Sequence, residues 1–253
     1  MSTTSAPLTD AAIMLRRNFK HTVRYPVALF NAILLPIVMM LIFVYVFGDA
    51  FSVGVDYIDY ATPGMLMMTV GYGLSATATA VNSDMTKGII NRFKVMDVSR
   101  SAVLTGHVVS TVVRTAVALA AIIGVAFLMG FSPSATFAHW LGAIGILLLT
   151  VFAVGWLTIA MGLAAKTLES AGFATVPLIM LPFLSSAIVP AEKMGPGARE
   201  FAEYQPFTPI IEALRGFFNG TPSTGHTIAA IAWCVGIAVV GYLWARAKFN
   251  KRG

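Results

Sequence analysis

Residues 83–100, SDMTKGIINRFKVMDVSR, form a polar island between two long apolar runs. Apolar residues recur in this island at intervals of four, four and three: Met85, Ile89, Phe93 and Met96. Polar residues recur on another face at intervals of three, four and three: Asp84, Lys87, Asn91 and Lys94. This spacing predicts a short amphipathic helix. The segment is either a solvated stretch on a lipid surface or a docking helix that receives force from a soluble partner.

The composition places the chain among integral membrane proteins. Of its 253 residues, 57% are hydrophobic and 11% are charged, whereas a soluble domain carries about 25% charged residues. The apolar residues come in runs of about 20 or more, long enough to cross the ~30 Å hydrocarbon core as helices. Continuous apolar runs are the wrong pattern for a membrane β-barrel. We therefore predict an all-α integral membrane protein.

The net charge of +6 would suggest nucleic-acid binding in a soluble protein. In a membrane protein it is explained by the excess of Lys and Arg in cytoplasmic loops, so no nucleic-acid partner is predicted. Cys234 is the single cysteine, which excludes an internal disulfide and a multi-cysteine metal site. The four histidines show no metal-ligand spacing, so we predict neither a metal site nor a catalytic residue.

We predict six membrane spans within one transmembrane domain that covers residues 1–253. The spans are approximately residues 26–47, 60–81, 102–129, 139–165, 171–189 and 228–245. Residues 9–24 precede them with cations on one face and apolar residues on another. Such a pattern predicts an interfacial helix whose cations face anionic headgroups.

Several residues inside the predicted spans have two interpretations. Asn31 either bonds across helices or sits near the inner interface. Met65, Met67 and Met68 either line an adaptable pocket or, as we favour from the sequence, face lipid. Arg114 lies within the third span, where a charge costs at least ~2.5 kcal/mol unless the side chain snorkels to the interface. Its functional and snorkelling roles are both open.

Residues 190–224 differ from every other loop because prolines, aromatic residues and charges alternate along them. The pattern predicts two short helices broken at residues 205–209. They are too short and too charged to span, so we expect external, re-entrant helices at the outer leaflet. Glu212 and Arg215 are three residues apart and can pair on one helical face. Together with Phe207 they form a predicted external gate, the alternative being that the segment only anchors to headgroups.

The distribution of charge predicts the orientation. With six spans and both termini in the cytoplasm, cytoplasmic segments hold 13 of the 17 Lys and Arg residues, and external loops hold three. The external loops also hold seven of the eleven acidic residues. This bias predicts cytoplasmic termini and a location in the plasma (inner) membrane.

Three stretches resemble the permease subunits of type-2 ATP-binding-cassette (ABC) exporters, most closely the daunorubicin-resistance-type drug permeases. They are DYATPGMLMM at residues 59–68, SDMTKGIINRFKVMDVSRSAVLTGH at residues 83–107, and LPFLSSAIVPAEKMGP with YQPFTPIIEALRGFF at residues 181–196 and 204–218. The chain departs from the family pattern at Lys87, Asp97 and Gln205, where the family usually has an acidic residue, proline and asparagine.

The resemblance implies a partner that hydrolyses ATP. The chain has no G-x-x-x-x-G-K-[ST] motif, so ATP and Mg²⁺ are expected on a separate ATPase present in two copies, with no cofactor bound directly here. A second permease is expected to complete a homodimer or heterodimer. The island then becomes a cytoplasmic coupling helix, whose predicted ATPase contacts are Met85, Lys87, Gly88, Ile89, Arg92, Phe93 and Met96.

By the same resemblance, spans one, two and five line the substrate route, with Asn31, Met68, Tyr72 and Phe183 as route residues. The prediction is a non-enzymatic permease that carries an amphiphilic or lipophilic drug or natural product outward. A lipid or a glycan carrier is an alternative cargo. An ion-coupled secondary transporter is the rival from another class, and it would show internal repeats and ionisable residues at the midplane, where Arg114 is the single candidate.

Cysteine labelling in a Cys234→Ala background tests the predicted orientation. A cysteine placed at Ser52 or Gly197 should react with a membrane-impermeant thiol reagent in intact cells, because both positions are predicted to lie outside. A cysteine at Asn91 should stay protected until the membrane is opened. Labelling with the opposite pattern would overturn the orientation.

Overall fold

The computed structural model describes residues 26–51, 53–86 and 100–252, and these form helices and turns with no strand among them. The all-α prediction is confirmed for this part of the chain. The predicted interfacial helix at residues 9–24 lies outside the described residues. The ends of the predicted coupling segment are described, and residues 87–99 between them are not.

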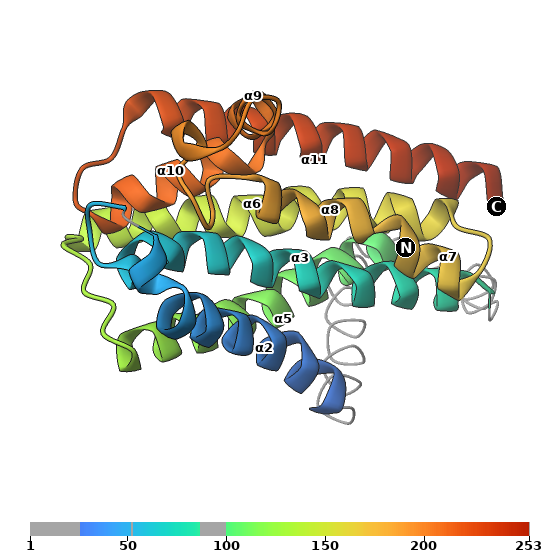
Figure 1. Ribbon diagram of the computed structural model, residues 1–253. Coiled ribbons are helices and arrows are strands. Elements are labelled where there is room, and N and C mark those ends of the chain that lie inside the picture. The colour runs from blue at the N-terminus through green and yellow to red at the C-terminus, as the bar shows by residue number, and fades with distance from the viewer. Residues whose placement is uncertain (1–25, 52, 87–99, 253) are drawn as a thin grey trace.

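Four helices in the described part run side by side along the molecule (Figure 1): α3 (Tyr57–Thr86), α5 (Arg100–Leu128), α6 (Phe137–Ala164) and α11 (Thr224–Arg252). Helix α6 packs against α11, α3 and α5. It therefore joins the C-terminal helix to the first half of the chain.

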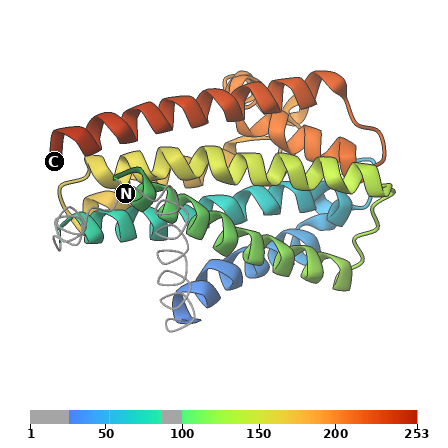
Figure 2. The ribbon, with the colours of Figure 1, turned by 180° about the vertical axis from the view of Figure 1, so that it is seen from behind.

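Helix α2 (Pro26–Leu41) packs against α3 and α5. It continues as a π-helical turn, η1 (Ile42–Val46), which is followed by the 3-10 turn η2 (Gly48–Ala50). The N-terminal end of α2 projects away from the bundle in both Figure 1 and Figure 2, which shows the molecule from behind.

Four described segments are long and apolar enough to cross a membrane: Tyr57–Thr86, Leu104–Leu128, Phe137–Ala164 and Thr224–Phe249. Each corresponds to one predicted span. The first and fifth predicted spans correspond to shorter apolar helical stretches, Ile33–Val46 and Leu168–Leu184. The chain is thus a multi-pass membrane protein.

The fifth predicted span is not one continuous helix, which corrects the predicted range of residues 171–189. It consists of α7 (Leu168–Ala174), α8 (Val176–Met180) and the 3-10 turn η3 (Leu181–Leu184), after which the chain continues in turns. Pro177 and Pro182 lie at the starts of α8 and η3. Because proline lacks the amide hydrogen that a helix interior needs, each proline begins a new helical piece.

Glycines bring α3 very close to its neighbours. A methyl group added at Gly162 of α6 would lie 2.5 Å from the carbonyl oxygen of Ala78 in α3. One added at Gly64 of α3 would lie 2.5 Å from the carbonyl oxygen of Ala187. Small residues permit this approach of one backbone to another, as at many helix contacts in membranes. Helix α3 consequently lies deep among its neighbours.

The three methionines of α3 lie inside the protein. Met65, Met67 and Met68 are each at most 1% exposed and belong to the main hydrophobic cluster. The lipid-facing position favoured from the sequence is therefore wrong. Lipid tails are about as apolar as leucine side chains, so hydropathy alone does not distinguish a lipid-facing residue from a buried one.

The glycine contact between α3 and α6 predicts a stability difference. Gly162→Ala should lower the melting temperature of the purified protein, because the added methyl meets the α3 backbone and overpacking costs about 1–3 kcal/mol. Gly145→Ala, on the same helix with no atom within 4 Å of the added methyl, is the matched control and should not destabilise. Equal melting temperatures for the two variants would contradict the close contact.

Candidate functional site

The candidate site lies where α3 begins and where the chain leaves η3. Two short helices, α9 (Ala198–Tyr204) and α10 (Phe207–Phe218), cover this end after the 3-10 turn η4 (Ala191–Lys193). Helix α10 packs against α3, α6 and α11 and is amphipathic. Its buried apolar residues are Phe207, Ile210, Ile211, Ala213, Leu214 and Phe218. This burial fixes the direction in which the polar face of α10 points.

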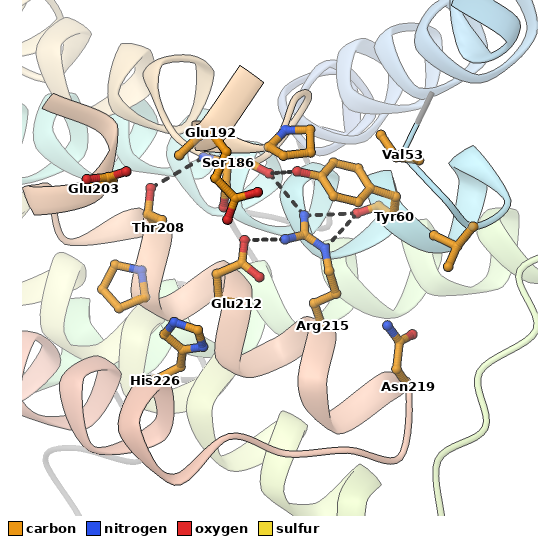
Figure 3. A pocket seen from close by; sticks show the side chains of 14 residues that line it. Val53, Tyr60, Ser186, Glu192, Glu203, Thr208, Glu212, Arg215, Asn219 and His226 are labelled. Carbon is orange, nitrogen blue, oxygen red and sulfur yellow. Dashed lines mark hydrogen bonds and ion pairs between the residues drawn. The ribbon is translucent and has the colours of Figure 1, made fainter. Parts of the chain in front are cut away.

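Arg215 is the centre of the site. Its side chain belongs to α10, yet the residue is only 8% exposed. Nη2 donates to the carbonyl oxygens of Ser186 at 3.0 Å and Tyr60 at 3.2 Å, and Nε also donates to Tyr60 at 3.4 Å. Nη1 pairs with the carboxylate of Glu212, as Figure 3 shows. The guanidinium also lies over the Tyr60 ring, 3.8 Å from its centroid, a favourable cation–π geometry.

The side chains of two tyrosines bond to the same stretch of non-helical chain. The Tyr60 hydroxyl donates to the carbonyl oxygen of Ser186 at 2.9 Å, and the Tyr57 hydroxyl donates to that of Ile188 at 3.1 Å. The Ser186 amide donates to Thr208 Oγ1 at 3.3 Å. A buried backbone outside a helix must find its hydrogen bonds elsewhere. Here the first turn of α3 and the polar face of α10 supply them.

The Glu212–Arg215 pair predicted from spacing is present. The spacing did not reveal that the guanidinium also bonds two carbonyl groups from distant parts of the chain. Tyr60 and Ser186 were therefore missed as partners. The sequence feature that points to Tyr60 is its position just before Pro63-Gly64. A side chain at Gly64 would collide with Ala187, so the turns that follow η3 pack against this part of α3.

A cavity of about 550 Å³ opens beside Arg215 (Figure 3). Its polar lining residues are Tyr60, Ser186, Glu192, Glu203, Thr208, Glu212, Arg215, Asn219 and His226. Three of these are carboxylates and one is a guanidinium. The Ser186 hydroxyl is buried and has no hydrogen-bond partner among the described residues. The cavity is therefore polar on the side where α10 meets the start of α3.

Helix α9 carries a different, exposed set of charges. Arg199 Nε donates to Glu203 at 2.7 Å, and this hydrogen bond raises the pKa of the guanidinium. The backbone amides of Glu200 and Gly197 lower the pKa of the Glu200 carboxyl. The Arg199 and Glu203 side chains are 48% and 41% exposed, so their pair contributes little to stability.

The other predicted gate and route residues do not line this cavity. Phe207 is 1% exposed and belongs to the main hydrophobic cluster together with Met68. Tyr72 and Phe183 are partly buried and pack against that cluster. Asn31 lies in α2, and its side chain is outside the described residues. Glu212 and Arg215 are thus the predicted site residues that the cavity brings together.

The opposite end of α3 carries the predicted coupling segment. Met85 packs, partly buried, against a second cluster that includes Leu104. The other predicted coupling residues lie outside the described residues: Lys87, Gly88, Ile89, Arg92, Phe93 and Met96. Asp84 Oδ2 lies 3.3 Å from His107 Nε2 of α5, which ties α3 and α5 together where the segment begins.

Asn82 adds a second tie at this end of α3. Its Nδ2 donates to the carbonyl oxygens of Gly162 at 3.2 Å and Ala165 at 2.8 Å. These acceptors lie at the end of α6. The last turns of α3 are therefore bonded to both α5 and α6. Among the described residues, no group of three or more His, Cys, Asp or Glu could hold a metal ion.

Comparisons with known proteins match nearly the whole chain. The family described as "ABC-2 type transporter" matches residues 9–219. The chain is 30% identical to the "Daunorubicin resistance ABC transporter permease protein DrrB1" of Streptomyces coeruleorubidus over 238 residues, 92% of this chain and 82% of that protein. It is 26% identical to the "Probable doxorubicin resistance ABC transporter permease protein DrrC" of Mycobacterium tuberculosis (strain ATCC 25618 / H37Rv) over 217 residues, 85% of this chain and 78% of that protein.

The contacts of Arg215 predict the outcome of a charge swap. Arg215→Ala should lower the melting temperature of the purified protein, because it removes hydrogen bonds from a charged donor to buried carbonyl oxygens, and such bonds contribute about 1.5–3 kcal/mol each. The swap Glu212→Arg with Arg215→Glu should not restore it, because a carboxylate at position 215 would face the carbonyl oxygens of Tyr60 and Ser186. Restoration by the swap would mean that the ion pair alone matters. Arg199→Ala, which breaks the exposed pair on α9, is the control and should change the melting temperature little.

Proposed function

The chain belongs to the ABC-2 type transporter family, and from this premise we propose that it is the permease subunit of an exporter driven by a separate ATPase. The observation that carries the proposal is the family match over residues 9–219. The polypeptide would itself be non-catalytic. It would provide the membrane passage, and nucleotide chemistry would take place on ATP and Mg²⁺ bound by the partner chain.

We propose that the protein lies in the plasma (inner) membrane, crosses it six times and has both termini in the cytoplasm. Helices α2 and η1 together run from Pro26 to Val46, about 31 Å at 1.5 Å per residue, which is enough for one crossing. Leu168–Leu184 is shorter and would cross together with the turns that follow it, packed against neighbouring helices. In this orientation α9 and α10 lie at the outer leaflet as re-entrant helices.

The proposed coupling segment is where a movement of the ATPase would be transmitted to the permease. Two ATPase copies would contact the two permeases of a homodimer or heterodimer, each through the apolar face that includes Phe93. The bonds of Asn82 and Asp84 to α6 and α5 join the start of this segment to the bundle. A displacement of the segment would therefore move α3 together with its neighbours rather than bend a free loop.

The Arg215 site is the proposed outer gate, with Glu212 in the ion pair and Phe207 anchoring α10 in the core. Arg215 joins α10 to the first turn of α3 and to the turns after η3. Any relative movement of these three segments must break or exchange its hydrogen bonds. This linkage favours the gate over the alternative, in which α9 and α10 only anchor the chain to headgroups.

The cargo is proposed to be an amphiphilic or lipophilic drug or natural product. The support is that two relatives are named for daunorubicin and doxorubicin resistance. Asn31, Met68, Tyr72 and Phe183 remain our proposed route residues. A lipid or glycan carrier is the alternative cargo, and an ion-coupled secondary transporter is the alternative class. Export that continues without ATP, driven by an ion gradient, would favour that class.

The coupling proposal predicts that Phe93→Asp abolishes both ATPase pull-down and substrate-stimulated ATP hydrolysis. The reason is that an unpaired charge on the apolar face cannot be buried in a cleft of the partner. Asn91→Asp is the matched control, since it adds the same charge on the polar face and should retain assembly. Wild-type assembly and hydrolysis in Phe93→Asp would refute the docking assignment.

A further inference from the structure

Arg114 is held between two helices at the middle of the bundle. It is the central residue of α5, equally far from Arg100 and Leu128. Its Nη2 donates to the carbonyl oxygen of Gly73 at 2.9 Å and to Thr77 Oγ1 at 2.7 Å. Gly73 is near the middle of α3. These bonds hold the guanidinium beside the middle of α3 instead of at an interface.

The positive charge at this depth has no counter-ion within the described residues. Both acceptors of Arg114 are neutral, and no described residue accepts from its Nε or Nη1. A guanidinium has five N–H donors, so three of them are left over. The residue is partly exposed, which leaves room for an acceptor from outside the chain.

A second copy of the chain would not supply the missing anion at mid-depth. The sequence contains no Asp or Glu in residues 60–83, 101–168 or 213–253. These ranges include nearly all of α3, α5, α6 and α11. The acidic residues nearest to Arg114 along α3 are Asp59 and Asp84, which lie near the two ends of that helix.

Joining α3 to α5 does not require a charge. The Nη2 group alone makes both contacts to α3, and the Thr77 and Thr111 hydroxyls join the same helices with a separate bond of 2.9 Å. A neutral amide could serve the same acceptors. An arginine brings a desolvation cost without a gain in this role, whereas ionisable residues inside membrane spans commonly mark substrate or ion pathways.

We propose that Arg114 binds the anionic group of an amphiphilic cargo, a phosphate or carboxylate attached to an apolar tail. This inference rests on the proposed exporter function for the existence of a cargo. The guanidinium keeps its charge, and its free Nε and Nη1 groups can each donate to an oxygen of the anion. Tyr72, a proposed route residue, and Gly73 are consecutive in α3, so the two lie at the same level along that helix.

The test measures saturable binding of radiolabelled dodecyl phosphate to the full-length permease in phosphatidylcholine nanodiscs. Dodecyltrimethylammonium, with the same chain length and opposite charge, is the paired probe. The wild-type protein should bind the phosphate at least tenfold more tightly than the ammonium compound.

Arg114→Gln should lose at least tenfold in phosphate affinity with little change for the ammonium probe. Arg114→Lys should fall between, because it keeps the charge and loses the separate Nε and Nη1 donors of the guanidinium. Arg199→Gln, at the exposed pair on α9, should match wild type.

Two outcomes of the binding assay overturn the inference, and neither depends on transport. Equal wild-type affinity for the two probes overturns it, even if Arg114→Gln does not fold. Equal phosphate affinity in wild type and in a monodisperse Arg114→Gln protein also overturns it. If the wild-type protein shows the anion selectivity but no ATP-driven export, that result counts against the exporter function alone. The binding assay itself contains neither ATP nor the partner ATPase.

Discussion

Backbone hydrogen bonding is the constraint on which this structure depends, because a membrane interior offers no water to unpaired amide and carbonyl groups. The long helices meet the constraint internally. The turns after η3 do not, and side chains from elsewhere bond their carbonyl oxygens: Arg215 and Tyr60 at Ser186, and Tyr57 at Ile188. The proline breaks in the fifth apolar segment thus create a need that α3 and α10 satisfy.

Close packing brings these donors within reach. Gly64 lets Ala187 approach α3 to a distance at which any side chain would collide. Gly162 does the same for Ala78 near the other end of α3. Between these contacts the methionines of α3 fill the core, a use that suits their flexible, unbranched side chains. Helix α3 therefore links the proposed gate at its first turn to the proposed coupling segment at its last.

Two arginines of the described chain illustrate different solutions to the burial of charge. Arg215 has a carboxylate, two carbonyl oxygens and an aromatic ring as partners, so its charge is compensated within the protein. Arg114 has two neutral acceptors on one nitrogen. The first arrangement stabilises a junction of three segments. The second leaves binding capacity for a group that the chain does not provide.

Local spacing and hydropathy were enough to establish some of this architecture. The sequence alone determined the all-helical membrane class, the positions of the four long apolar helices and the pairing of Glu212 with Arg215. Each follows from the physics of neighbouring residues, namely transfer of apolar runs into hydrocarbon and the three-residue spacing of a helical face. Tertiary structure decided that the α3 methionines are buried and that Arg215 bonds Tyr60 and Ser186. Hydropathy cannot separate lipid from protein interior, because both are apolar, and spacing carries no information on which distant carbonyl lacks a partner.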